Sequence, residues 1–216
     1  MTRQASPART VRREPVQHRS AVRVERMLDA AAILLEEVGI EGLTTSAIAA
    51  RARVSVGSLY QFFPDKHAVV ESLARRSFER YSAQLEGIVT QDWREAVDNV
   101  IDLYVAFSRD EPGFLVLSFG GPVGLHALDP EDDNNAVVAR AMGAVIGDLG
   151  ISDDILRLAV ELGDSILALA FRRDRAGDPA LVAEAKTAVK AYLAAKLASP
   201  SLGQPLSAKA SFQTGS

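Results

Sequence analysis

TTSAIAARARVSVGSLYQFFPDK, residues 44–66, contains two short helical segments with a tight turn between them. Thr44 is a favourable N-cap for the first segment, because its side chain can accept a hydrogen bond from an otherwise free backbone N–H. Residues 53–55 end that segment, and the second one covers roughly 56–62. Pro64 follows it, since proline cannot continue the interior of a helix. The stretch therefore predicts helix, turn and helix within a short length of chain.

The second short segment carries the side chains that a DNA-reading helix needs. Small residues near its N-terminus would let the backbone approach base edges in a major groove; they are Ser55, Val56, Gly57 and Ser58. Tyr60 can donate its hydroxyl to a phosphate, Gln61 can pair with adenine, and Lys66 can reach the DNA backbone. Leu59 and Phe63, four residues apart, would anchor the helix on its domain. Serines and a glycine alone fit an ordinary cap and turn, so the interpretation depends on the whole pattern.

Helical patterns continue on both sides of this stretch. Between Ser20, an expected N-cap, and Gly39, an expected stop, apolar residues recur every three or four positions. They form one stripe: Val24, Leu28, Ala31, Leu35 and Val38. After Pro64, Asp65 can cap a long fourth helix that we expect to reach Gly87.

The remainder of the chain also reads as helical. We expect helices at about 92–109, 136–149, 153–175 and 178–197, the last with Pro179 at its first position. FLVLSF, residues 114–119, could be a buried helix or a strand, and the helical surroundings favour a helix. No hairpin signal and no repeat is visible. The sequence therefore predicts an all-α fold of about nine helices.

Composition limits the possible functions. The 216 residues contain no cysteine and carry a net charge of −4. Residues 1–86 hold 13 Lys and Arg against 10 Asp and Glu, a charge of +3, whereas residues 87–216 hold 11 against 18, a charge of −7. A basic N-terminal part hints at a polyanionic partner. Without a secretory h-region or a long apolar run, we expect a cytoplasmic, nucleoid-associated protein with no membrane partner.

The two ends of the chain are polar. Residues 1–19 are rich in arginine and contain two prolines, so we expect a disordered arm in which Arg12 and Arg13 could contact phosphate. Residues 199–216 are low in apolar content, and we expect them to be a disordered tail. The domains expected between these ends are a DNA-binding domain at 20–66 and a larger domain at 67–198.

Residues 20–66 resemble the DNA-binding domain of TetR/AcrR-family transcriptional regulators. The pattern runs in order through the chain without a gap from Thr44 to Lys66. It comprises Ala31-Ala32, Leu35, Gly39 to Gly42, Thr44-Thr45, Ile48-Ala49, Ala52, Val54-Ser55, Gly57, Leu59-Tyr60, Phe63 and Lys66. The resemblance implies a three-helix DNA reader, a connecting fourth helix, and a C-terminal helical domain that binds an effector and dimerises.

The resemblance also implies roles for particular residues. Phosphate contacts fall on Thr44, Thr45, Tyr60 and Lys66, and the base-facing surface falls on Ser55, Val56, Ser58 and Gln61, with Gly57 allowing close approach. Two positions depart from the family pattern. Arg53 stands where glycine is common in the turn, and it could alter the turn or add a phosphate contact. Phe62 stands where histidine is common and should pack against the first or fourth helix, while His67 is a further candidate DNA contact.

For the larger domain, we expect aromatic and polar residues to line a pocket for a largely apolar effector. The candidates are Trp93, Tyr104, Phe107, Phe114, Phe119, His126 and Met142. Alanine-rich faces in residues 153–175 and 178–197 permit close helix approach, so they are the candidate homodimer interface. We expect the long fourth helix to couple the two domains.

These observations predict a homodimeric, ligand-responsive repressor that binds a palindromic DNA operator. An activator, or a regulator without an effector, remains an alternative, as does a helical small-molecule-binding protein or enzyme. No Ser/His/Asp arrangement can be argued, and GGPVG at 120–124 lacks the lysine and hydroxyl residue of a phosphate-binding loop. We therefore expect no enzymatic activity, no cofactor and no metal.

Overall fold

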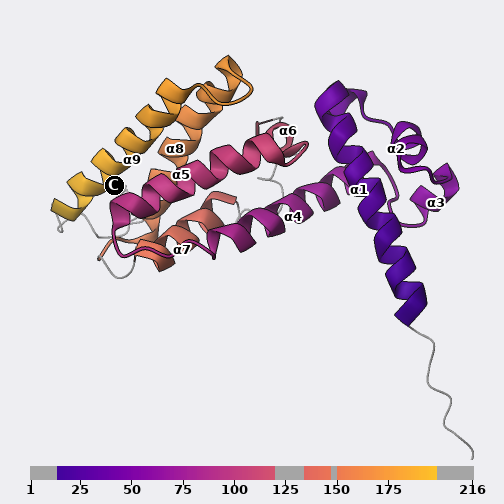
Figure 1. The fold of residues 1–216 in the computed structure, drawn as a ribbon, viewed down its shortest axis with the longest axis horizontal. Coiled ribbons are helices and arrows are strands. Elements are labelled where there is room, and N and C mark those ends of the chain that lie inside the picture. The colour runs from indigo at the N-terminus through magenta and orange to yellow at the C-terminus, as the bar shows by residue number, and fades with distance from the viewer. Residues whose placement is uncertain (1–13, 120–133, 147–149, 199–216) are drawn as a thin grey trace, which may run out of the picture.

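A computed structural model describes residues 14–119, 134–146 and 150–198. Over these residues the chain forms nine helices and no strand (Figure 1). They are α1 (Glu14–Gly42), α2 (Thr45–Ala52), α3 (Val56–Tyr60), α4 (Lys66–Leu85), α5 (Trp93–Asp110), α6 (Phe114–Phe119), α7 (Asn134–Ile146), α8 (Asp153–Arg173) and α9 (Pro179–Ala198). The all-α prediction is confirmed, and FLVLSF is a helix rather than a strand.

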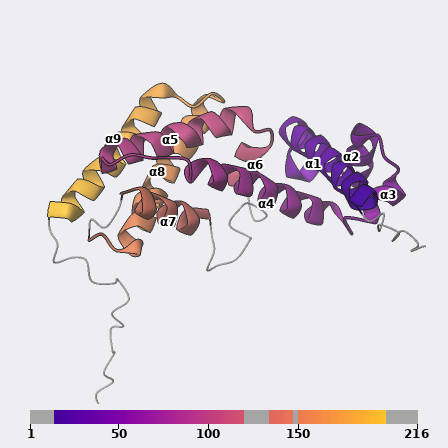
Figure 2. The same ribbon diagram turned by 60° about the horizontal axis from the view of Figure 1, so that its bottom comes forward.

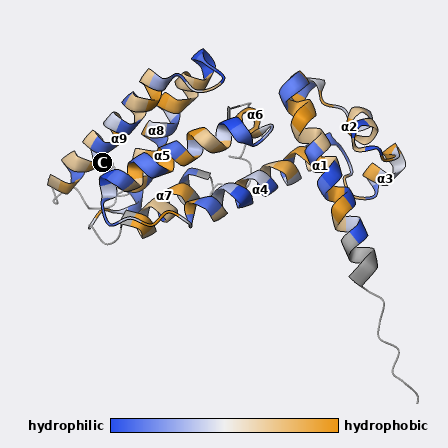
Figure 3. Cartoon of the chain, viewed as in Figure 1, coloured by the Kyte–Doolittle hydropathy of each residue, from blue (hydrophilic) through white to orange (hydrophobic). Residues whose placement is uncertain are grey.

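The helices form two groups joined by α4 (Figure 1). Helices α1 to α3 lie at one end of α4, and α5 and α7 to α9 lie around its other end. Helix α6 lies between the two groups beside α1, and the turned view shows the same arrangement (Figure 2). Hydrophobic and hydrophilic residues alternate along the helices of both groups, as amphipathic helices require (Figure 3). Among the described helices, none is both long and apolar enough to cross a bilayer.

Helix α1 differs from its prediction at the N-terminus. It begins at Glu14, so Ser20 lies inside the helix and is not its N-cap. Pro15 is the reason that the earlier start is possible, because a residue in the first turn has no intrahelical acceptor for its N–H and proline needs none. At the other end, Gly39 breaks the helix as predicted, with φ 68° and ψ 179°.

Side-chain caps fix the three short connections around the helix-turn-helix. Thr44 Oγ1 accepts the N–H of Ala47 at 3.1 Å, which confirms Thr44 as the N-cap of α2. Ser55 Oγ accepts the N–H of Ser58 at 3.0 Å at the start of α3. Asp65 Oδ1 accepts an N–H at 2.9 Å at the start of α4. Each cap satisfies a backbone donor that a helix N-terminus would otherwise leave unpaired.

The C-terminal helices pack through small residues. A Cβ atom added at Gly163 of α8 would meet Val189 Cγ2 of α9 at 3.2 Å, so glycine lets these two helices approach closely. Ala159 and Ala185 on the same helices are fully buried. Lys186 and Lys190 of α9 form ion pairs with aspartates of α5, each at 2.6 Å. These contacts hold α5, α8 and α9 together beside α4.

Candidate nucleic-acid interface and effector cavity

Helix α3 exposes a face with small side chains to solvent. Val56 is 38% exposed and Tyr60 is 52% exposed, so both side chains are accessible on this surface. A Cβ atom added at Gly57 would meet nothing within 4 Å, and Gly57 does not have a positive φ. Neither the packing nor the backbone of this chain therefore requires glycine at position 57. Leu59, fully buried on the opposite side, anchors the helix as predicted.

Two hydroxyl groups meet beside this surface. The hydroxyl of Tyr60 lies 3.2 Å from Thr45 Oγ1, so α3 and α2 each contribute one polar group to the same exposed spot. Hydroxyls can donate to phosphate oxygens, and such contacts set the position of a protein on DNA. The structure thus brings together two of the four residues predicted to contact phosphate.

Lys66 has a structural partner that the sequence did not indicate. Its Nζ donates to the backbone carbonyl oxygens of Ile40 at 3.2 Å and Glu41 at 3.4 Å, at the end of α1. A lysine ammonium has three N–H donors, so one remains for another acceptor. The contact with α1 fixes the position of this charge, and a phosphate contact from Lys66 stays a prediction.

The other candidate DNA-contact residues are distributed around this surface. Gln61 and His67 are exposed, while Ser58 is half-buried. Phe62 is partly buried and packs against the hydrophobic core, which agrees with a packing role in place of a polar contact. Arg12 and Arg13 lie outside the described residues.

Arg53 keeps the left-handed turn despite having a side chain. Its φ is 55° and its ψ is 47°, and it is the one non-glycine residue with positive φ in the described ranges. Its N–H donates to the carbonyl of Ala50 at 3.2 Å, which closes α2. The turn therefore has the geometry that glycine would adopt, at a cost of about 1–2 kcal/mol for an L-residue.

Two neighbouring arginines connect α1 and α2 through side-chain hydrogen bonds. Arg26 of α1 donates to the carbonyl of Ala52 at 2.6 Å. Arg51 forms two hydrogen bonds with the Glu37 carboxylate, at 2.7 and 2.8 Å, and this bond raises the pKa of Arg51. Arg53, by contrast, is exposed, and no ion pair of its side chain is seen among the described residues, so a phosphate contact from Arg53 stays a prediction.

We expect Arg53→Gly to stabilise the fold by up to about 1 kcal/mol. Glycine relieves the left-handed strain but loses more backbone entropy on folding, about 0.5–1 kcal/mol. Urea unfolding at fixed protein concentration measures this change. If Arg53 contacts phosphate, the slope of log affinity against log salt should also fall by about 1. Arg53→Lys is the matched control, because it keeps the charge and the strained backbone.

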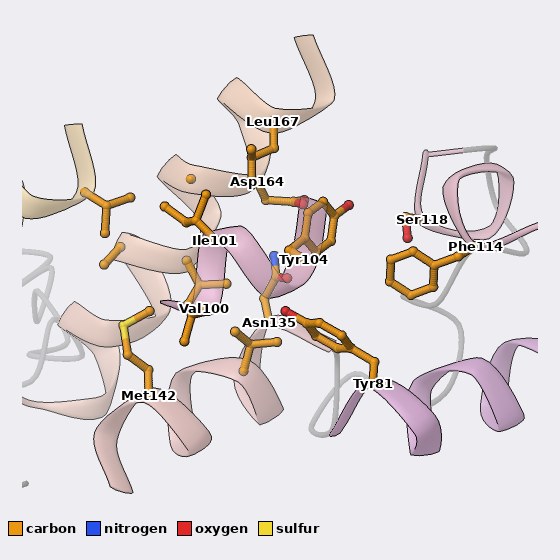
Figure 4. Close-up of a pocket in the computed structure, with 15 residues that line it drawn as sticks. Tyr81, Val100, Ile101, Tyr104, Phe114, Ser118, Asn135, Met142, Asp164 and Leu167 are labelled. Atoms are coloured by element: carbon orange, nitrogen blue, oxygen red, sulfur yellow. The ribbon is translucent and has the colours of Figure 1, made fainter. Parts of the chain in front are cut away.

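The C-terminal domain contains a partly open cavity between α4, α5, α6, α7, α8 and α9. It leaves about 60 Å³ for the centres of water-sized molecules, which is room for several waters or a small ligand. Figure 4 shows the labelled side chains around this space. The lining is mostly apolar, with five polar residues: Tyr81, Tyr104, Ser118, Asn135 and Asp164.

Three predicted pocket residues line this cavity, namely Tyr104, Phe114 and Met142. Phe107 does not line it; its ring packs edge-on against Phe114 with centroids 4.8 Å apart and supports the lining from behind. Trp93 is also outside the lining, since it begins α5 and its ring lies under the guanidinium of Arg94 at 4.2 Å. His126 and the side chain of Phe119 fall outside the described part of the chain.

The sequence analysis missed the polar residues of the lining. Asn135 ends the polar run DPEDDNN, and Asp164 is one acidic residue among many. Tyr81 has the helical spacing of a buried residue on the fourth helix, which does not by itself indicate a pocket. Helical spacing places these side chains inward, but no local pattern says that elements so distant in sequence enclose one cavity.

Burial and a nearby charge keep both cavity tyrosines protonated. Loss of solvent raises the pKa of Tyr81 and of Tyr104, and the negative charge of Asp164 raises both further. Their phenol groups are therefore neutral O–H groups at physiological pH. They can donate a hydrogen bond to a ligand in the cavity.

The cavity domain contacts the helix-turn-helix end of the molecule through α1. The N–H of Gly113, just before α6, donates to Glu36 Oε1 at 3.1 Å, and Arg175 pairs with the second oxygen of Glu36 at 2.8 Å. On α4, Arg76 bonds Glu25 and Asp29 of α1 at 2.9 and 2.8 Å. Two separate sets of contacts thus tie α1 to the rest of the chain.

A helix-turn-helix domain joined by a long helix to a second helical domain is an architecture of DNA-binding regulators. Residues 27–73 match the family described as bacterial regulatory proteins, tetR family. Residues 91–197 match the family described as tetracyclin repressor-like, C-terminal domain. A TetR-family transcriptional regulator from Streptomyces coelicolor is 34% identical, with a TM-score of 0.69, over 82% of this chain and 98% of that one.

The chain belongs to the TetR family of transcriptional regulators, which are DNA-binding proteins and not enzymes. Within it, the HTH-type transcriptional repressor KstR from Rhodococcus jostii is 44% identical over 63 residues, 29% of each chain. KstR from Mycolicibacterium smegmatis is 39% identical over 64 residues, 30% of this chain and 31% of its own length. The match thus spans less than a third of these repressors. The fatty acid degradation regulator FadR from Bacillus halodurans, 20% identical with a TM-score of 0.58 over 79% of this chain and 94% of that one, shares the fold.

Proposed function

We propose that the protein is a homodimeric, ligand-responsive repressor that binds a palindromic operator through α3. The observation that carries the DNA-binding surface is Gly57, which faces open space where no contact within the chain calls for glycine. The adjoining hydroxyls of Tyr60 and Thr45 supply groups for phosphate. Repression is supported by the KstR relatives, whose similarity lies in a short part of the chain.

A ligand could act through the contacts around the cavity. Tyr81 of α4 and Phe114 of α6 line it, and Gly113, beside Phe114, bonds to Glu36 of α1. A ligand that repacks these side chains would change the position of α1 and α4 relative to the cavity domain. DNA affinity changes only if the ligand binds the two arrangements with different affinities.

Helices α8 and α9 are the proposed dimer interface. They form the most extensive helix pair of the C-terminal domain, and Leu158 of α8 is 44% exposed. Two such pairs can form a four-helix bundle, which is a common way to bury apolar helix faces. Each dimer would then place two copies of α3 in successive major grooves.

The direct test is an electrophoretic mobility shift assay with DNA from upstream of the protein's own gene. Binding of a dimer, with competition by unlabelled specific DNA, is the expected result. A folded dimer that fails to bind this DNA even at low salt would overturn the proposed DNA-binding regulator. Release of DNA on adding a ligand separates the ligand-responsive repressor from a regulator without an effector.

We expect Tyr60→Ala to weaken binding to specific and non-specific DNA by a similar factor, about tenfold. The proposed role of the Tyr60 hydroxyl, which lies beside Thr45, is a contact with phosphate, and a phosphate carries no sequence information. Fluorescence anisotropy with an operator and a scrambled duplex measures both affinities. Tyr60→Phe, which removes only the hydroxyl, separates that group from the ring. A change in sequence preference without a loss of affinity would contradict the phosphate assignment.

A further inference from the structure

One side of α1 carries three arginines, Arg19, Arg23 and Arg26. They are four and three residues apart, so they lie on the same side of the helix, which we call the arginine face. Arg19 and Arg23 are exposed, and neither forms an ion pair with another described residue. Arg26 donates to the carbonyl of Ala52, so the arginine face is turned toward the end of α2.

The acidic residues of the same part of α1 are paired on a different side of the helix. Glu25 and Asp29 contact Arg76 of α4 at 2.9 and 2.8 Å, and Glu25 also lies 3.5 Å from Arg80. The Arg76 side chain is only 10% exposed, so these pairs belong to the contact between α1 and α4. The charges of α1 are therefore segregated, with carboxylates toward α4 and arginines toward α2.

The spacing of Arg19 and Arg23 is unfavourable for the helix itself. Like charges four residues apart on a helix repel each other and weaken it slightly. No ion pair within the described chain offsets this repulsion. A local cost without internal compensation is typical of a functional surface, and here it indicates an external partner of negative charge.

The arginine face leads to the turn in front of α3. One surface groove is lined by Arg26 of α1 and by Arg53, which follows α2 and is exposed. The N-terminal part of α1 continues past α2 and α3, as its indigo end shows (Figure 1). A duplex that receives α3 in its major groove would therefore bring its backbone near this face.

We propose that Arg19 and Arg23 bind the phosphate backbone of DNA beside the groove that receives α3. A guanidinium group is always charged and its N–H donors match the geometry of phosphate oxygens. The inference rests on the proposed function, because it takes α3 as the helix that enters the major groove. Since phosphates carry no sequence information, these contacts position the protein and strengthen its binding to any duplex.

The double variant Arg19→Gln/Arg23→Gln of the full-length protein tests the proposal. The probes are DNA from upstream of the protein's own gene and a scrambled duplex of equal length. Each phosphate contact contributes about −0.9 to the slope of log affinity against log salt, so the slope should become shallower by about 2 for each bound protomer. Affinity for both duplexes should fall by the same factor, roughly tenfold or more near 0.1 M salt. An unchanged slope, or a loss confined to the upstream DNA, would overturn the phosphate assignment.

Two further variants separate local charge from other effects. Arg19→Lys/Arg23→Lys keeps both charges and should keep the salt slope, and a loss equal to that of the glutamine variant would overturn the charge-based contact. Arg94→Gln removes an exposed arginine at the start of α5 and should leave the slope unchanged. Arg23→Gln alone should reduce the slope by about 1 for each protomer. Equal effects of Arg94→Gln and Arg23→Gln would mean that net charge, and not the arginine face, governs binding.

Thermal unfolding separates a DNA contact from a structural role. Because the glutamine double variant removes a repulsion, its melting temperature should equal or exceed that of the wild type. A lower melting temperature together with weaker DNA binding would overturn the proposal and assign the arginines to folding. Wild-type protein that binds neither duplex at low salt contradicts the DNA-binding proposal itself. Wild-type protein that binds both, with variants that bind equally well, contradicts only the arginine contacts.

Discussion

Gly57→Leu is expected to reduce operator affinity about 100-fold while leaving the protein folded. The side chain would extend from the exposed face of α3, where no atom of the chain lies within 4 Å of the added Cβ. In the proposed complex that space belongs to base edges, and each lost base contact costs about 1–3 kcal/mol. The fold itself should gain roughly 0.5–1 kcal/mol, because leucine is a better helix former than glycine.

Opposite effects on stability and on DNA binding make this variant diagnostic. Anisotropy titration gives the affinity, and urea unfolding gives the stability at the same protein concentration. Ala106→Leu is the matched control, since it adds the same side chain to an exposed position of α5 without touching the reader. Operator affinity equal to that of wild type in Gly57→Leu would show that this face of α3 does not enter the groove.

Much of the DNA-reading end could be predicted because its signals are local. Thr44 and Asp65 cap helices as their residue types indicate, and Gly39 stops α1 where the apolar stripe ends. The misplaced start of α1 came from reading Ser20 as a cap, although Pro15 was an available signal for an earlier first turn. Capping and helix-stop residues therefore predicted the ends of these helices. The prediction was wrong only where Ser20 and Pro15 indicated different starts for α1.

The cavity could be predicted only in part because it depends on distant contacts. Tyr104, Phe114 and Met142 are large residues on inward faces, and they do line the cavity. Phe107 has the same character but packs behind Phe114. Which inward residue faces empty space and which fills the core depends on the rotation of each helix against its neighbours. Periodicity within one helix does not contain that information.

The backbone conformation of Arg53, in the turn after α2, also could not be predicted from local sequence. The sequence suggested that Arg53 could change the turn, because a left-handed L-residue is strained. The structure keeps the left-handed conformation, and the strain is offset by the surrounding contacts, including the hydrogen bond from Arg26 to Ala52. Tertiary contacts thus overrode a local preference of about 1–2 kcal/mol.

The second large effect is expected at Gly113, where Gly113→Ala should destabilise the protein by about 2–5 kcal/mol. Two independent costs add at this position. The backbone has φ +79°, which costs an L-residue about 1–2 kcal/mol. A Cβ atom would also lie 3.2 Å from the carbonyl oxygen of Ala32 and 3.3 Å from Leu35 Cδ2, and such overpacking costs about 1–3 kcal/mol.

Gly150→Ala separates these two costs. Gly150 has a similar φ of +69°, but its added Cβ would meet nothing within 4 Å, so it should lose only the backbone part, about 1–2 kcal/mol. Urea unfolding of both variants, at one protein concentration because a dimer's stability depends on it, gives the difference. A larger loss at Gly113 measures the close approach between α1 and the turn before α6, through which the cavity domain contacts the reader. Equal losses in the two variants would mean that α1 moves away from the added methyl group at almost no free-energy cost. A contact of that kind could not transmit a change from the cavity to the DNA-binding helices.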